Sequence, residues 1–349
     1  MRSKYTPEEK TKLVFLSLNQ KEYSRSYELL NYNYPNFIES KFKHIRSDSK
    51  FIEVFKVVIE FRKSNAVFIV CSPSHALVPL IRILSRKRIV LDAGWPLSDG
   101  NLSRENQGVL YHRFFKNYLT DWIAFRIADR VLVESKIQRR RISRNFRIRI
   151  DKFFVRYTGF SNRGSKSGGK INVDVERILQ TDERQILFLF RGKYNNESGL
   201  NKILDAFSEI DTRYQLILLS NFVPSNPLPV NAVHISRYLN HSELELLYRK
   251  VDISIGQLGN SPRTQYSIPH KAFESAYYGV PYISKDSPAL REFFSDSPGV
   301  KYIDVVNTSL SAQLIEAAAD SKFRASGRSL RKTLEKINSE EEILDALLR

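Results

Sequence analysis

Short apolar runs that alternate with helical patterns are the feature that most constrains the fold of this chain. In the first half, the apolar runs cover residues 12–17, 66–71, 88–91, 130–134 and 152–155. Helical patterns stand among them at residues 51–62, 76–85 and 111–127. The second half repeats the alternation, with apolar runs at residues 185–190, 215–219, 232–235, 251–255 and 282–284. Because strands separated by helices pair in parallel, the sequence predicts an α/β chain with two doubly wound sheets.

A polar segment rich in Gly and Ser, residues 161–170, separates the two halves and is typical of a flexible connector. With 349 residues, of which 42% are hydrophobic, the chain can bury two ordinary cores. We therefore expect a first domain over residues 1–160, a linker over 161–170 and a second domain over 171–349. A C-terminal helix, expected at residues 339–348, is a candidate to pack back on the first domain.

Several common protein classes do not fit this composition. The single cysteine, Cys71, lies within an apolar run, so neither a disulfide framework nor a Cys-based zinc site is expected. No stretch approaches 18 uninterrupted apolar residues, and residues 1–10 lack the apolar core of a signal peptide. The six His and the scattered Asp show no metal-ligand spacing, so we expect no metal and no cofactor. These features favour a cytoplasmic protein.

The segment from Ser267 to Pro281 carries the clearest functional signal. Pro269 suits the first turn of a helix, and Gly279 suits its C-terminal cap. Apolar runs before and after the segment complete a βαβ unit, in which ligands bind where strand ends meet the start of a helix.

Lys271 and Glu274 are the residues of this helix that point to a chemistry. They lie three residues apart, so both can face the crevice outside the strand ends. A cation suits phosphate, and a carboxylate suits sugar hydroxyls. The pair therefore predicts nucleotide-sugar binding, whereas the alternative is a solvated ion pair on a helix surface.

A second candidate segment runs from Phe190 to Leu200. It follows an apolar run and opens a helical pattern, and Gly192 and Gly199 allow close approach of the backbone. Free N–H groups of such a turn, together with Lys193, can face a diphosphate. An ordinary strand-to-helix turn is the alternative.

The run from Gly256 to Glu292 resembles the donor-site segment of GT-B glycosyltransferases of family 4. In that family a Pro-any-Lys-any-any-Glu helix, followed by Gly-any-Pro, holds the nucleoside diphosphate sugar. The matching positions here are Pro269, Lys271, Glu274, Gly279 and Pro281. The resemblance covers most of the chain and is strongest over residues 185–292. It implies the GT-B architecture, two Rossmann-like domains that face a cleft, and sugar transfer with retention and without a metal.

The resemblance also assigns the remaining donor residues and shows two departures from the family pattern. Lys193 stands where the family has the first diphosphate-binding cation, and Ser198 stands where it has the second. We expect Arg191 or Arg263 to replace the missing cation. The first of two family Glu residues is replaced by Tyr266, whereas the second is Glu274, a predicted catalytic and donor-binding residue. The predicted donor site is completed by Arg237 and Tyr238.

The first domain is expected to bind the acceptor. Asp92, Asp99 and Arg104 look like the Asp, Asp and Arg of the corresponding loop in relatives of this branch. A carboxylate there orients or deprotonates an acceptor hydroxyl, and Asp92 and Asp99 are therefore predicted catalytic residues. The alternative is a pair of turn-forming Asp residues. His75, which follows the strand that ends at Cys71, either caps a helix or contacts the acceptor, and capping is our expectation.

The excess of positive over negative charge lies in the first half. The formal net charge of +17 lies wholly before Lys166, because the rest of the chain has equal numbers of each sign. A dense basic segment, interleaved with Ile and Phe, consists of Lys136, Arg139, Arg140, Arg141, Arg144, Arg147, Arg149 and Lys152. This pattern predicts an anionic membrane surface as partner. A solvated helix with its apolar residues in the core is the alternative. No nucleic-acid-binding motif is present, so we expect no nucleic acid as partner.

These features together predict a glycosyltransferase. We expect transfer of a sugar from a nucleotide sugar to a membrane-associated acceptor, a lipid-linked glycan, in the synthesis of cell-surface polysaccharide or glycolipid. The enzyme would act as a peripheral protein on the inner face of the plasma membrane. Two alternatives remain open: a GT-B sugar-nucleotide epimerase, and a non-catalytic polyanion-binding protein on a degenerate scaffold that lacks the cation at Ser198 and the carboxylate at Tyr266.

Overall fold

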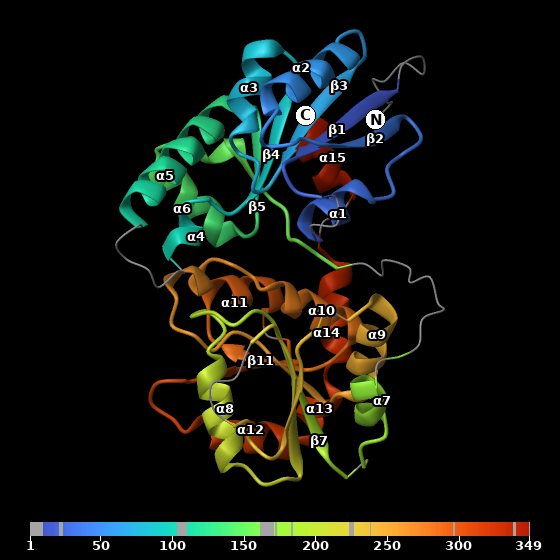
Figure 1. Cartoon of the computed structure of the whole chain (residues 1–349), viewed down its shortest axis with the longest axis vertical. Helices are drawn as coiled ribbons and strands as arrows, with labels where there is room; N and C mark the ends of the chain where they lie inside the picture. Colours follow the sequence, from blue (N-terminus) through green and yellow to red (C-terminus); the bar gives the residue numbers. More distant parts are fainter. Residues whose placement is uncertain are drawn as a thin grey trace. The chain divides into compact units, whose positions relative to one another are not determined.

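Two compact units make up the chain, as seen in a computed structural model (Figure 1). The structure describes residues 10–20, 24–102, 110–160, 171, 173–182, 184–222, 227–237, 239–295, 297–337 and 340–348. Unit 1 comprises Met1–Thr158 with Asn338–Arg349, and unit 2 comprises Gly159–Ile337. The expected linker, residues 161–170, lies outside the described residues.

The sheet of unit 1 has six strands in the order β2-β1-β3-β4-β5-β6, and all neighbours are parallel. The strands are β1 Thr11–Ser17, β2 Ile38–His44, β3 Ala66–Cys71, β4 Ile89–Gly94, β5 Arg130–Val133 and β6 Phe153–Val155. The order of winding reverses between β1 and β3, which is where an open sheet forms its ligand crevice.

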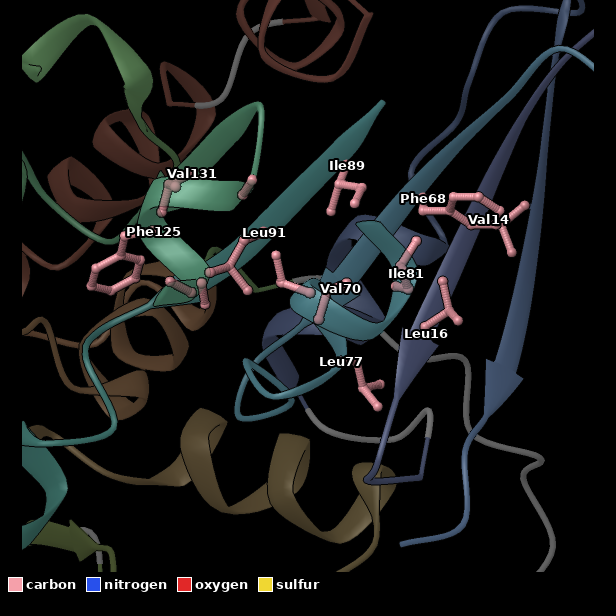
Figure 2. Packing of buried hydrophobic residues seen from close by; sticks show 14 of the residues in the cluster. Val14, Leu16, Phe68, Val70, Leu77, Ile81, Ile89, Leu91, Phe125 and Val131 are labelled. Atoms are coloured by element: carbon pink, nitrogen blue, oxygen red, sulfur yellow. The ribbon is translucent and has the colours of Figure 1, made fainter. Parts of the chain in front are cut away.

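Helices cover both faces of this sheet, which explains why its strands are continuous apolar runs. One face is covered by α2 Lys50–Glu60, α3 Leu77–Leu84, α5 Leu110–Ile127 and α6 Lys136–Phe146. The other face is covered by α1 Ser24–Leu30 and α15 Glu340–Leu348. The short elements are α4 Asp99–Leu102 and the 3-10 turn η1 Ile150–Lys152. Alternate residues of β1 and β3 point to α3 in the first core, as Figure 2 shows for Val14, Leu16, Phe68 and Val70 with Leu77 and Ile81.

The sheet of unit 2 is also parallel and has the order β12-β11-β10-β7-β8-β9. The strands are β7 Ile186–Arg191, β8 Tyr214–Leu219, β9 Ala232–Ile235, β10 Ile253–Ile255, β11 Tyr282–Lys285 and β12 Val300–Ile303. The helical elements are α7 Val173–Leu179, α8 Leu200–Glu209, α9 His241–Lys250, η2 Pro262–Gln265, α10 His270–Tyr278, α11 Pro288–Phe294, α12 Leu310–Ala319, α13 Ser321–Ala325 and α14 Arg328–Glu335. Buried clusters on the two faces involve α8 and α12 on one side and α7 and α9 on the other. Winding reverses between β7 and β10.

The predicted α/β class with two doubly wound sheets is confirmed, and two local expectations are corrected. Strand β2 was not expected, because it is an edge strand that carries Glu39, Lys41 and Lys43 and so lacks an apolar run. No regular element was expected between residues 92 and 106, but β4 continues to Gly94 and α4 lies in this range. No helix in the described part of the chain is long and apolar enough to cross a bilayer.

Candidate functional site

The switch point of unit 2 lies between the carboxyl ends of β7 and β10. Phe190 pairs with Ile255 across these strands, so the next residues, Arg191 and Gly256, lie at the same edge of the sheet. Open parallel sheets bind ligands at this edge, where winding reverses. The switch point therefore marks the candidate site of unit 2.

Helix α10 brings its first turn to this edge. It begins after Pro269, whose extended ψ of 141° places the chain just outside the helix, and it ends at Gly279. Gly279 has a φ of +70°, a left-handed conformation that glycine adopts at low cost. The short helix predicted from the sequence is confirmed.

Lys271 lies buried at the switch point. Its Nζ donates a 3.0 Å hydrogen bond to the carbonyl of Gly256 and lies 3.8 Å from the centre of the Phe190 ring. A Cβ placed on Gly192 would stand 3.5 Å from the same Nζ. The ammonium group therefore lies against the start of residues 192–199, which we call the glycine-rich turn. Burial lowers the pKa of Lys271 to about 7. Lys271 therefore brings to the switch point a group that gains charge readily when an anion approaches.

Three side chains contact the carboxylate of Glu274. One carboxylate oxygen accepts a hydrogen bond from Arg191 and lies 2.9 Å from Nδ1 of His270, and the other accepts a 3.1 Å bond from the Tyr248 hydroxyl. Burial alone raises the pKa of Glu274, but Arg191 and His270 outweigh burial and hold that pKa well below its usual range. Glu274 is therefore a permanent carboxylate, suited to accept hydrogen bonds rather than to give up a proton. Arg191 is half-buried and keeps part of its guanidinium in solvent.

The glycine-rich turn is closed by contacts with the loop after β10. Gly199 has a φ of +65°, and a Cβ there would stand only 2.6 Å from the backbone carbon of Leu258. The backbone N–H of Leu258 donates to the carbonyl of Ser198 at 3.2 Å. The buried Ser198 hydroxyl donates to the carbonyl of Asn195 at 2.6 Å, so this residue stabilises the turn and supplies no charge. Lys193, by contrast, is exposed to solvent.

The other predicted donor residues lie around this turn or outside it. Arg263, in η2, donates a 3.1 Å hydrogen bond to Glu197 of the turn, so its charge is shared with a carboxylate. Tyr266 is half-buried at the end of η2. Arg237 pairs with Glu243, the carboxylate that also closes the capping box of α9. Tyr238 lies outside the described residues.

In unit 1, Asp92 is the centre of a buried charge cluster. Nε of Arg25 donates to its carboxylate at 2.7 Å, and a guanidinium nitrogen of Arg156 lies 3.5 Å from the other oxygen. Arg25 also donates to the Thr158 hydroxyl at 3.2 Å, and that hydroxyl donates to Glu134 at 3.0 Å. Asp92 has no exposed surface. In this conformation it organises two guanidinium groups and does not present a free base.

Asp99 is held in the same manner. At the start of α4, it accepts two hydrogen bonds from the Arg141 guanidinium, at 2.5 and 2.7 Å, and a longer one of 3.4 Å from Gln138. These contacts anchor α4 to α6. Arg104, the third member of the predicted acceptor loop, lies outside the described residues.

His75 does not cap a helix, contrary to expectation. Helix α3 begins after Ala76 without a side-chain cap, and the His75 ring packs against Phe125 with a centroid separation of 5.8 Å. Its Nε2 lies 3.8 Å from the carboxylate of Asp121. Burial lowers the pKa of His75 to about 4 and raises that of Asp121 to about 7, so the ring is neutral at physiological pH. The His75 ring is therefore part of the core of unit 1, where it packs against Phe125 of α5.

The basic segment forms α6 and the turn after it. Its apolar side chains Ile142 and Phe146 are buried in the core of unit 1. Arg139 donates to the carbonyl of Ile150 at 3.1 Å, whereas Arg140 and Arg144 are exposed. Ile142 and Phe146 are therefore the core-facing stripe of an ordinary helix, whereas Arg140 and Arg144 face outward and Ile150, in the turn after α6, is 46% exposed.

Several contributors to these sites were not predicted from the sequence. Tyr248 and His270 surround Glu274, and Arg25, Arg156 and Asp121 surround the predicted acceptor residues. His270 had a signal, because it lies inside the Pro-any-Lys motif at the first helical position. The others have no local signal, since each reaches its partner across the fold. Within the described ranges, no group of three or more His, Cys, Asp or Glu is placed to hold a metal ion.

Comparison with known proteins identifies the architecture. No protein-family model matches the chain, and no curated protein matches its sequence. Solved structures match along almost the whole chain. Sucrose-phosphate synthase from Thermosynechococcus elongatus is 12% identical, with 96% of this chain and 97% of that chain covered and a TM-score of 0.69. HepE of Anabaena in complex with UDP-glucose is 12% identical, with 96% and 98% covered and a TM-score of 0.68. A glycosyltransferase from Rickettsia africae is 13% identical, with 97% and 96% covered and a TM-score of 0.63.

At such low identity, this similarity establishes the fold alone. The chain has the GT-B architecture of two Rossmann-like domains, as the resemblance of the donor segment implied. Membership of family 4 stays a prediction.

Proposed function

We propose that this protein is a glycosyltransferase that binds a nucleoside diphosphate sugar in unit 2 and transfers the sugar to an acceptor hydroxyl. The observation that carries the proposal is the position of Lys271 and Glu274 on the first turns of α10, at the switch point between β7 and β10. The similarity to HepE, which was solved with UDP-glucose, makes a uridine nucleotide the first donor to examine.

The side chains suggest a division of labour. Lys271, with the N–H groups at the start of α8 and α10, neutralises the diphosphate as the bond between it and the anomeric carbon breaks. Glu274, a carboxylate held by Arg191 and His270, accepts hydrogen bonds from ribose or sugar hydroxyls. The acceptor oxygen then bonds to the anomeric carbon, and its proton passes to the departing diphosphate. We also propose that the configuration at the anomeric carbon is retained, because the donor segment resembles that of family 4.

We place the acceptor at unit 1. Because guanidinium groups engage Asp92 and Asp99, we propose both as positioning residues, which orient the guanidinium groups of Arg156 and Arg141. The net charge of +17 lies before Lys166, and Arg140 and Arg144 project into solvent. These features support a lipid-linked glycan acceptor on an anionic membrane, in polysaccharide or glycolipid synthesis at the inner face of the plasma membrane.

The test begins with thermal stabilisation by a panel of nucleotide sugars, because a ligand of the native state raises the apparent stability. The donor found is then incubated with polyprenyl-linked and glycerolipid-linked glycans, and the products are analysed. Sugar transfer or donor hydrolysis that falls by about tenfold or more in Glu274→Ala and is kept in Glu316→Ala supports the proposal. Glu316 is a matched control on α12, exposed and paired with Lys301. Epimerised sugar nucleotide without acceptor would identify an epimerase, and stabilisation by polyanions without turnover would identify a binding protein.

A further inference from the structure

Three helices of unit 1 carry apolar side chains on the surface that faces away from the sheet. Ile83 is 80% exposed, Phe115 69% and Phe51 63%. The same surface also exposes Ile52, Phe55, Ile59, Leu84, Leu119 and Trp122. Scattered apolar residues are normal on a protein surface, but a soluble monomer seldom exposes so many large ones on adjacent helices.

Helix α2 shows why this surface is not a by-product of core packing. Its inner stripe, Val54, Val57 and Val58, already supplies the side chains that the sheet requires. The exposed residues at 51, 52, 55 and 59 form a second apolar stripe, which lies about a third of a turn from the first around the helix. A helix with two apolar stripes is expected to have both of them covered.

The exposed residues lie on three helices that are neighbours in the fold, and we call the surface that they form the apolar face. Helix α2 contacts α3, and α3 contacts α5, all on the same side of the sheet (Figure 1). A groove of about 320 Å³ between α2 and α3 is lined only by Phe51, Ile52, Phe55, Leu80, Ile83 and Leu84. The apolar face therefore extends over three neighbouring helices.

Exposed cations lie on the helices of the apolar face and on the turns next to them. Exposed basic residues on α2, on the turn after it and after α3 are Lys56, Arg62, Lys63 and Arg86. Helix α6 lies beside α5, since the rings of Tyr118 and Phe146 stack 4.8 Å apart, and it exposes Arg140 and Arg144. A second copy of this chain is a poor partner, because two such faces would bring like charges together in a protein of net charge +17.

We propose that the apolar face of α2, α3 and α5 docks on the surface of an anionic lipid bilayer. Its Phe, Ile and Trp side chains enter the boundary between headgroups and acyl chains, and the surrounding Lys and Arg contact lipid phosphates. The side chains that enter the bilayer thus come from α2, α3 and α5, and the basic helix α6 supplies charge only. Docking by the apolar face deepens the membrane association in the proposed function and rests on it, but it needs neither donor nor acceptor, so it can fail independently of the transfer reaction.

The single native cysteine allows a direct test. Cys71 is fully buried, so an Ile83→Cys variant carries one reactive thiol for an environment-sensitive fluorophore. Vesicles of equal parts phosphatidylcholine and phosphatidylglycerol should shift the emission to shorter wavelength. The same label on a Val306→Cys variant should show no shift, because Val306 is 70% exposed but belongs to unit 2.

A sedimentation assay with the same vesicles measures the contribution of the apolar face. The Phe51→Ser/Ile83→Ser variant should lower the partition coefficient by about tenfold or more, since each lost side chain removes apolar area from the bilayer. A Val173→Ser/Val306→Ser control, which changes two equally exposed residues of unit 2, should bind as the wild type does. High salt should weaken binding without abolishing it.

Four outcomes would overturn the proposal. Equal emission shifts at positions 83 and 306, or wild-type sedimentation of the Phe51→Ser/Ile83→Ser variant, would exclude the apolar face. An emission shift that depends on protein concentration without vesicles would indicate a second copy as the occupant. Binding that is lost in Arg140→Gln/Arg144→Gln but is indifferent to the apolar face would assign docking to the basic helix alone.

Discussion

Replacing Lys271 by Met should make the ligand-free protein more stable and its phosphate binding weaker. Methionine has similar length and packs favourably on an aromatic ring, so it can occupy the space over Phe190 without the charge. The hydrogen bond to the Gly256 carbonyl is lost, and an unpaired buried acceptor costs about 1 to 3 kcal/mol.

The substitution also removes a buried ammonium group, which stabilises the protein and opposes the cost of the lost hydrogen bond. The size of this gain follows from the pKa of Lys271, which burial lowers from 10.5 to about 7. Because the folded pKa lies below the unfolded one, stability from this group is complete above pH 10.5 and is lost as the pH falls to about 7. At 1.36 kcal/mol per unit, the destabilisation is about 4 kcal/mol at pH 7 and about 2 kcal/mol at pH 9. Lys271→Met should therefore be about 1 to 3 kcal/mol more stable than the wild type at pH 7, and this advantage should shrink by about 2 kcal/mol at pH 9.

Urea unfolding at both pH values tests this expectation. Both tryptophans, Trp95 and Trp122, belong to unit 1, so their fluorescence follows unit 1 and circular dichroism adds the transition of unit 2. Only the transition of unit 2 should move. Lys202→Met, which removes an exposed lysine of α8, should leave both transitions and their pH dependence unchanged.

Calorimetry with UDP and uridine tests the predicted effect of Lys271→Met on phosphate binding. Loss of a charged hydrogen bond should weaken UDP binding by about tenfold to a hundredfold in Lys271→Met and leave uridine binding unchanged. If the variant is less stable than the wild type at pH 7 and has a parallel pH dependence, the argument that burial disfavours the charged form of Lys271 is refuted.

Three further predictions follow from other contacts. Glu274→Ala should raise the donor KM or lower kcat/KM by about tenfold to a hundredfold, and unchanged steady-state kinetics would remove it from the donor site. Asp92→Asn should lower the free energy of unfolding by about 3 kcal/mol, because Arg25 then stays buried without its counter-ion; a loss below 1 kcal/mol in urea unfolding would contradict this. Gly199→Ala should lower stability by more than about 1 kcal/mol through its positive φ and the contact with Leu258, and an unchanged transition midpoint would show that the turn can relax.

The fold and the position of the donor helix could be predicted from the sequence because both depend on local patterns. Apolar runs separated by helical stretches imply parallel strands whatever the details of packing, and the Pro269 and Gly279 signals delimit α10 without reference to distant residues. Strand β2 could not be predicted, because an edge strand half in solvent tolerates alternating charges such as Lys41 and Lys43.

The sequence by itself determined that Lys271 and Glu274 stand three residues apart at the start of a helix that follows a parallel strand. Only the tertiary structure decided what these groups face, because Arg191 reaches Glu274 from 83 residues away and Arg25 reaches Asp92 from 67 residues away. Tertiary packing also decided which apolar stripe of α2 is buried and which is exposed. Helical periodicity shows that a helix has two apolar sides, but only packing against the sheet selects the side that water or a bilayer meets.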